Sequence, residues 1–298
     1  MSQYPSPVRH LRTSIPGHKD SFALIATPQA DPVERAVVFV HGFNGSAGGT
    51  WTDFISLIDS MANRTWWEQS DVYFFDYHWA SVFRQVGRNT TTLLGFLDDI
   101  FPNPPMELFS TPEVKLREQC EYKELMLVGH SEGGLLLRKA IVATAGDDDR
   151  LEAYRIDPAR ATKPEPAPEG IEVAELRLFA PAIGGEALTG FKGIVASTFA
   201  RFLHVSAAKT SMASPSSPVV TAREHTEHYA NFLQLPCFRA HILWADDDDV
   251  VLSEKYLHDK TCRNVRPGTD HVSVCKPSLL YLLPVHFVEK GVVNGKCN

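Results

Sequence analysis

Short apolar runs recur along the chain, and a turn-forming residue closes each of them. The runs are rich in Val, Leu, Ile and Phe, and most lack the strict alternation of a strand with one solvated face. Strands of a parallel sheet have this composition because both of their faces are buried. The pattern therefore predicts strands at 21–28, 35–42, 71–79, 124–130, 175–182 and 239–246.

Two longer segments, 51–62 and 132–145, carry apolar residues three and four positions apart, which is the period of an amphipathic helix. Gly146 and an aspartate run follow the second segment and are typical of a helix end. Strands that alternate with helices predict the α/β class, with a mostly parallel central sheet and helices on both faces.

One domain, 1–298, is expected, because α/β folds of this length often form a single unit. The segment at 157–170 is rich in Pro and Ala and predicts an extended surface loop. The stretch 184–236 is long for a connection between a strand and a helix. We expect it to form an inserted helical cap over the functional site.

The net charge and the hydropathy of the chain argue against some classes of protein. The formal net charge is −7 without a basic stripe, so nucleic acid is not an expected partner. The N-terminus lacks the apolar core of a secretory signal, and no run of about 18 apolar residues predicts a transmembrane segment. A cytoplasmic location is therefore expected, and the oligomeric state is left open.

The cysteines do not follow a metal-binding pattern. Their count is odd and they lack C-x-x-C spacing, which argues against a disulfide framework and a zinc knuckle. A single pair between Cys262 and Cys275 stays open. The full set is Cys120, Cys237, Cys262, Cys275 and Cys297.

The segment "LVGHSEGGLLLR" combines the end of a predicted strand, a serine between glycines and the start of a predicted helix. A nucleophile elbow needs these three parts, and it needs small neighbours because the strained turn leaves no room for side chains. The context predicts Ser131 as a nucleophile. The alternative is a Gly-Ser turn with a purely structural role.

The segment "FVHGFNGSAGG" ends the second predicted strand in a Gly-rich loop. Acyl transfer needs hydrogen-bond donors directed at the developing oxyanion. In this arrangement we expect the backbone N–H groups of Phe43 and Glu132 to be these donors. Phosphate binding is the competing interpretation of the loop, but the loop has no G-K-[ST] sequence.

These segments resemble the α/β-hydrolase superfamily, with its H-G-[FL] oxyanion loop at 41–43 and its G-x-S-x-G elbow at 129–133. The resemblance covers nearly the whole chain and implies a Ser-His-Asp catalytic triad in the order nucleophile, acid, histidine, with no metal or organic cofactor. More narrowly, the chain resembles lipase-like and SERAC1/PGAP1-like esterases. This implies a small-molecule or lipid-like ester substrate.

The acid is expected after the last predicted strand, in "ADDDDVVLSEKYL". Alignment of Val250 and Val251 with the family's V-V pair selects Asp248. Asp246 is the second candidate, because four consecutive aspartates leave the register open. A solvated acidic turn or a cation site is the alternative.

The base is expected at His271 in "VRPGTDHVSVCKP", which resembles the histidine-to-Lys-Pro ending of some hydrolases. His271 would take the proton of Ser131 and return it to the leaving group. Other histidines are interpreted structurally. His225 and His228 lie three apart on a predicted helix, but no third ligand is evident, so a solvated helix face is favoured over a metal site.

Glu132 departs from relatives that carry an uncharged residue after the nucleophile. Facing the oxyanion, its carboxylate would oppose the developing charge, so we expect it to point away and to be paired or solvated. The hypothesis is that Glu132 disfavours acidic leaving groups or recognises a cationic one.

The sequence thus predicts a serine hydrolase that cleaves carboxylic esters, of the lipase, carboxylesterase or thioesterase type, through an acyl-enzyme. Two alternatives are a peptidase or amidase of the same fold and a catalytically inactive binding protein with this fold.

Overall fold

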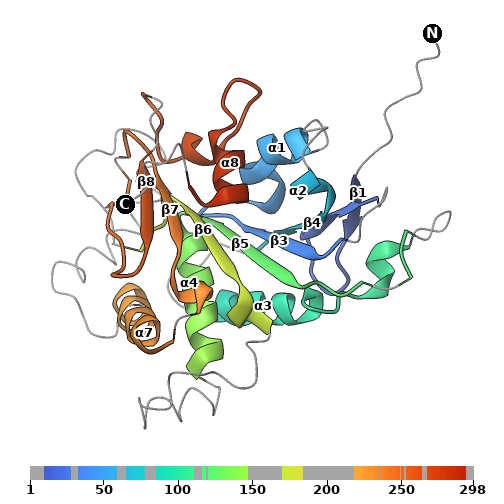
Figure 1. Cartoon of the computed structure of the whole chain (residues 1–298), viewed down its shortest axis with the longest axis horizontal. Coiled ribbons are helices and arrows are strands. Elements are labelled where there is room, and N and C mark those ends of the chain that lie inside the picture. Colours follow the sequence, from blue (N-terminus) through green and yellow to red (C-terminus); the bar gives the residue numbers. More distant parts are fainter. Residues whose placement is uncertain are drawn as a thin grey trace.

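A single twisted sheet runs through the centre of the computed structural model (Figure 1). The structure describes residues 10–27, 33–58, 65–77, 85–110, 116–118, 120–146, 170–183, 218–233, 235–248, 250–251, 253–263 and 267–292. Within these ranges the strands are β1 His10–Ser14, β2 Phe22–Ala26, β3 Arg35–Val40, β4 Ser70–Phe75, β5 Glu124–His130, β6 Glu175–Phe179, β7 His241–Trp244 and β8 Lys260–Arg263.

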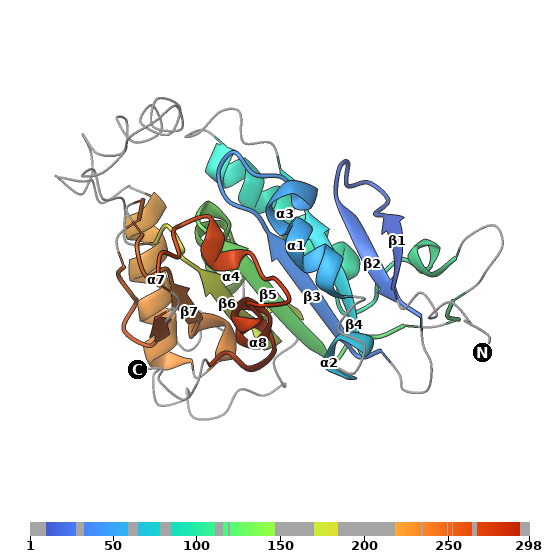
Figure 2. The ribbon, with the colours of Figure 1, turned by 90° about the horizontal axis from the view of Figure 1, so that it is seen from above.

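The strand order is β1-β2-β4-β3-β5-β6-β7-β8. From β4 to β8 every neighbouring pair is parallel, whereas β2 pairs with both β1 and β4 in antiparallel fashion. Figure 2 shows β1 and β2 at one end of the sheet and β7 near the other. The carboxyl ends of the parallel strands thus share one edge of the sheet, where α/β proteins place their sites.

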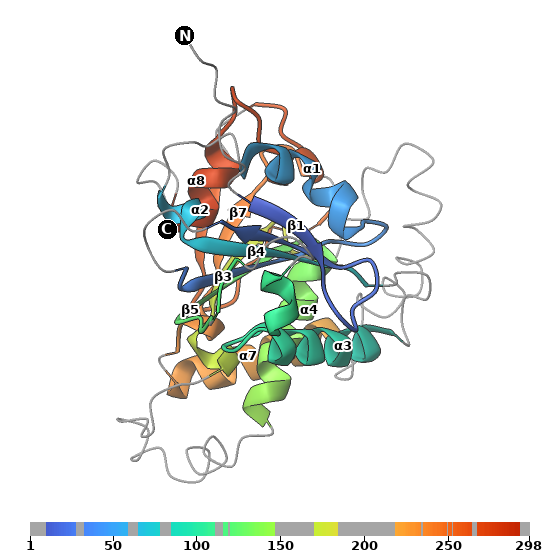
Figure 3. The same ribbon diagram turned by 90° about the vertical axis from the view of Figure 1, so that its right-hand side faces the viewer.

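Helices cover both faces of the sheet. They are α1 Ala47–Ile58, α2 Thr65–Glu68, α3 Gln85–Ile100, α4 Glu132–Gly146, α7 Pro218–Phe232 and α8 Leu283–Lys290, with short 3₁₀ turns η1 Met106–Phe109, η3 Gly170–Val173, η4 Pro236–Phe238 and η5 Ser273–Cys275. Figure 3 shows α1, α2 and α8 on one face and α3, α4 and α7 on the other. The mostly parallel sheet with two helical layers confirms the predicted fold class.

The six strands predicted from the sequence are all present, with ends that differ by a few residues. The sequence analysis missed β1 and β8, which lie at the two edges of the sheet and are short. β1 has one buried residue followed by alternating half-buried and exposed positions, and β8 has the sequence KTCR. Neither has the continuous apolar run by which the central strands were found.

The predicted helix at 51–62 begins earlier than expected, at Ala47. The Asp76 carboxylate accepts a hydrogen bond from the Ala47 N–H (2.8 Å), and Ser46 Oγ accepts one from the Gly49 N–H (3.0 Å). These contacts satisfy N–H groups that have no partner inside the helix, so they set its first turn. The sequence pattern did not predict α3, whose first half contains three Thr and one Gly, residue types with low helix propensity.

Only the end of the expected cap falls within the described residues. Here α7 packs beside α4 on one face of the sheet, and the Tyr229 ring stacks on Phe238 of η4 at 5.5 Å between centroids. Residues 184–217 lie outside the described residues, as do 157–169 of the expected surface loop. The cap over the site therefore stays a prediction.

Cys262 on β8 is disulfide-bonded. Cys275 is a free, buried thiol in η5 whose Sγ lies 3.4 Å from the Val272 carbonyl oxygen, so the pairing of Cys262 with Cys275 is wrong. Disulfides persist mainly in oxidising compartments. The cytoplasmic location stays a prediction. Within the described ranges, no helix has the length and apolarity that a membrane crossing requires.

Candidate active site

Ser131 lies on the sharp turn between β5 and α4. Its φ of +53° is in the left-handed region, which non-glycine residues rarely occupy. A Cβ atom on Gly133 would overlap the carbonyl oxygens of Val40 and His41, and one on Gly129 would lie 2.8 Å from the Gly134 nitrogen. The glycines on both sides of Ser131 are therefore required by the close approach of α4 to β3 and β5.

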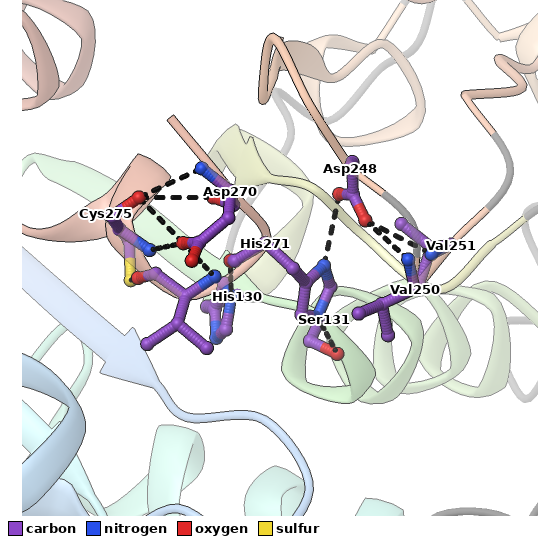
Figure 4. Close-up of polar contacts among 10 residues, drawn as sticks. His130, Ser131, Asp248, Val250, Val251, Asp270, His271 and Cys275 are labelled. Atoms are coloured by element: carbon purple, nitrogen blue, oxygen red, sulfur yellow. Dashed lines mark hydrogen bonds and ion pairs between the residues drawn. The ribbon is translucent and has the colours of Figure 1, made fainter. Parts of the chain in front are cut away.

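Three side chains from distant parts of the chain meet at this turn (Figure 4). His271 Nε2 lies 2.9 Å from Ser131 Oγ, and His271 Nδ1 lies 3.0 Å from Asp248 Oδ2. All three side chains are largely buried, with Ser131 3 % and His271 7 % exposed. With the proton on Nδ1 donated to the carboxylate, Nε2 is left to accept the Ser131 hydroxyl proton.

Backbone hydrogen bonds distinguish Asp248 from the other aspartates of the run. Asp248 Oδ1 accepts from the N–H groups of Val250 (3.0 Å) and Val251 (3.1 Å), and this turns Oδ2 towards His271. Burial raises the pKa of Asp248, but the hydrogen bonds from His271 and the two amides outweigh it, and the net pKa is lowered. Asp246 is exposed, and no contact joins it to His271 in the part of the chain that the structure describes.

The loop that carries His271 is attached to the elbow by a second histidine. His130 Nε2 donates to the backbone carbonyl of His271 at 2.8 Å, from the residue directly before Ser131. Burial, and then the neighbouring His271, lower the pKa of His130 to about 3, so its ring is neutral and the proton needed for this hydrogen bond stays on Nε2. Local motifs do not reveal this contact, because it joins residues 141 positions apart.

The Gly-rich loop after β3 passes directly over Ser131. A Cβ on Gly42 would lie 2.8 Å from the Ser131 Cβ, so only glycine allows this approach. The loop then turns back through a hydrogen bond from the Gly45 N–H to the Gly42 carbonyl (3.1 Å). Phe43 follows Gly42, and Glu132 follows Ser131. Gly42 and Ser131 are therefore in close contact. Each is followed in the chain by a residue that we expect to donate its backbone N–H to the oxyanion.

Neither a family model nor a curated protein sequence matches the chain. Among solved structures, an inhibited esterase B from Lactobacillus rhamnosis aligns over 91 % of this chain and 80 % of its own, with 10 % identity and a TM-score of 0.50. The chain has the α/β-hydrolase fold.

Two further solved structures align over nearly the full length of this α/β-hydrolase fold. The alignment with the siderophore hydrolase EstB from Aspergillus fumigatus covers 97 % of this chain and 97 % of EstB, at 11 % identity and a TM-score of 0.49. Est1E from Butyrivibrio proteoclasticus covers 94 % of this chain and 96 % of its own at 14 % identity and a TM-score of 0.47.

Within the hydrolase fold, the Glu132 side chain is buried rather than solvated. It is 6 % exposed, and its Oε2 lies 3.4 Å from the hydroxyl oxygen of Tyr77. Burial raises the pKa of Glu132 to about 7, although the Tyr77 hydrogen bond acts in the opposite direction. The sequence analysis did not single out Tyr77, because its "YFFDYHW" segment has the composition of a core strand.

The two histidines of α7 do not form part of this site. His225 and His228 both lie on the exposed side of the helix. Among the described residues, no three side chains of the His, Cys, Asp or Glu type lie close enough together to hold a metal ion. The polar side chains at the carboxyl edge of this hydrolase fold thus offer a hydroxyl, an imidazole and a carboxylate in one hydrogen-bonded row.

Proposed function

We propose that the protein is a serine hydrolase that cleaves carboxylic esters through an acyl-enzyme on Ser131. The observation that carries the proposal is the continuous row from Asp248 through His271 to Ser131, with contacts of 3.0 and 2.9 Å. Nucleophile, base and orienting acid are the parts that nucleophilic catalysis requires, in hydrogen-bond reach of one another.

In the first half-reaction, Ser131 Oγ attacks the ester carbonyl carbon while its proton moves to His271 Nε2. The carbonyl electrons move onto oxygen, where the N–H groups of Phe43 and Glu132 stabilise the negative charge. When the tetrahedral intermediate collapses, the C–O bond of the alcohol breaks and the alkoxide takes the proton from His271. Asp248 keeps the imidazole in the required tautomer and stabilises the imidazolium.

In the second half-reaction, water replaces the alcohol. His271 accepts a proton from the water, the hydroxide adds to the acyl carbon, and Ser131 leaves with the proton from His271. These steps use side chains and water alone. The esterase B that shares the fold is named for ester cleavage, which favours esters over amides as the substrate class.

Labelling with a fluorophosphonate probe tests the proposal. We expect one probe molecule to attach to the wild-type chain, and mass spectrometry to place it on Ser131, since such probes phosphonylate activated serines. Ser131→Ala should show no adduct. Ser56→Ala is the matched control, because Ser56 is an exposed serine on α1. It should label like the wild type.

A panel of short-chain to long-chain esters, a thioester and an amide then defines the bond that is cleaved. Turnover of the esters that disappears in Ser131→Ala supports the proposal. Adduct formation at another serine, or a folded wild-type protein that neither labels nor turns over any of these compounds, would contradict it and leave the binding-protein alternative.

A further inference from the structure

Tyr77 joins the nucleophile elbow to the start of the oxyanion loop. It follows β4, is 5 % exposed, and its ring stacks on the His41 ring at 4.2 Å between centroids and 3° between planes. Its hydroxyl oxygen lies 2.9 Å from the His41 carbonyl oxygen and 3.4 Å from Glu132 Oε2. One buried hydroxyl thus faces one oxygen of each segment.

The number of protons restricts what these three oxygens can do. A tyrosine hydroxyl carries one proton, and a backbone carbonyl only accepts hydrogen bonds. The shorter distance assigns the Tyr77 proton to the His41 carbonyl. The contact between Tyr77 and Glu132 is then a full hydrogen bond only when the carboxyl group supplies the second proton. An ionised Glu132 competes with the His41 carbonyl for the single proton of Tyr77.

We propose that Glu132 is a positioning residue whose protonated carboxyl completes a relay, from Glu132 to Tyr77 to the His41 carbonyl, that holds the oxyanion loop against the elbow. The inference rests on the proposed function and adds an ionisable group to it. The carbonyl that receives the relay lies two residues before Phe43, whose N–H is a proposed oxyanion donor. Ionisation of Glu132 weakens this attachment and puts a negative charge beside the hole.

The other groups around the relay are consistent with a neutral, buried environment. His41 Nδ1 donates to the Gly42 carbonyl at 2.8 Å, and its Nε2 accepts from the Tyr77 N–H at 3.4 Å, so both nitrogens are used by a neutral ring. Burial lowers the pKa of His41. Asp76 is the nearest carboxylate, 3.9 Å from His41 Nε2, and it is engaged by the Ala47 N–H.

On the side of the elbow, the titratable groups nearest in the chain or in contact with Ser131 are His130 and the His271–Asp248 pair. Burial lowers the pKa of His130 and keeps its ring neutral. No cation contacts the Glu132 carboxylate among the described residues, and burial accordingly raises the pKa of Glu132 to about 7. The relay is therefore complete below neutral pH and is lost as the pH rises through this value.

The test compares kcat as a function of pH for the wild type and Glu132→Gln, on an ester from the panel. The wild type should lose about 10-fold of its maximal kcat by about pH 9, with KM little changed, because the oxyanion donors act in the transition state. Glutamine donates an N–H to Tyr77 at every pH. Its kcat at about pH 9 should stay within about twofold of its own maximum.

Two variants separate this role from general effects of burial. Tyr77→Phe removes the centre of the relay, so it should lower kcat at every pH and should keep only the part of the alkaline decline that the Glu132 charge itself causes. Glu172→Gln is the matched control, because Glu172 is similarly buried, in η3. It should keep the wild-type profile. A Glu132→Gln enzyme that declines like the wild type, or that changes KM instead of kcat, would refute the relay.

Infrared difference spectroscopy gives a measurement that does not depend on activity or on the variants. The wild-type protein should retain a protonated carboxyl above about pH 6, where ordinary carboxyls are ionised. The absence of such a group overturns the inference even if Glu132→Gln does not fold. Probe labelling of Ser131 separates a failure of the relay from a failure of the proposed function. If Ser131 is labelled but Glu132→Gln does not change the pH profile of kcat, the relay alone is refuted. If Ser131 is not labelled, both the proposed function and the relay are refuted.

Discussion

The Asp248→Asn variant is expected to lose about 10⁴-fold in kcat, whereas Asp246→Asn should stay within about threefold of the wild type. The asparagine oxygen can still accept from the Val250 and Val251 N–H groups, which contact Oδ1 of Asp248. Its amide NH₂ then faces His271 and can only donate. The imidazole must turn or change tautomer, and Nε2 no longer accepts the serine proton.

The measurement is kcat on an ester that the wild type cleaves, with the thermal midpoint of each variant as a check on folding. Asp246→Asn is a matched control, because it makes the same chemical change two residues away at an exposed position. Equal losses in the two variants, or a larger loss for Asp246→Asn, would show that the acid has been assigned to the wrong aspartate.

The Asp259→Asn variant is expected to lower the free energy of unfolding by about 3 kcal/mol. Asp259 and Arg138 form a buried ion pair, with 0 % and 1 % of their side chains exposed. Asp259 also accepts from the N–H groups of Ala240 (2.9 Å) and Tyr256 (3.0 Å). Removal of the carboxylate charge leaves the Arg138 guanidinium buried without a counter-charge. Arg138 lies on α4, the helix that directly follows Ser131.

Urea unfolding followed by circular dichroism measures this loss. The control is Glu254→Gln, which breaks the exposed contact between Glu254 and Arg223, with 47 % and 44 % of the side chains exposed. Solvent screens that pair, so its loss should change the free energy of unfolding by less than about 1 kcal/mol. Similar losses in the two variants would contradict the expectation that burial increases the contribution of the Arg138–Asp259 pair to the free energy of unfolding.

The sequence predicted the centre of the fold better than its edges. β3 and β5 lie between two strands each and are covered on both faces, so their sequences had to be continuously apolar. The elbow was equally evident, because a tight turn needs small residues whatever surrounds it. Among the described strands, β1 and β8 have one neighbour each, and their sequences are correspondingly polar and short.

The residues of the candidate site could likewise be predicted only in part. Ser131 and His271 could be selected from local motifs, but the choice among four aspartates depends on a turn in which the N–H groups of Val250 and Val251 hold Asp248. Tyr77 and His130 could not be found in this way. Their contacts with Glu132 and with the His271 loop exist only because the ends of β4, β5 and β8 meet at one edge of the sheet.

The position of β8 in the sheet has a consequence for how activity is lost. This four-residue strand pairs only with β7 among the described strands, and the loop with His271 follows it, whereas Ser131 follows the central β5. Edge elements open with a smaller free energy than the interior. Fraying at this edge would loosen the chain that leads to the His271 loop while the central strands remain folded, so we expect the proposed activity to be lost before the chain unfolds.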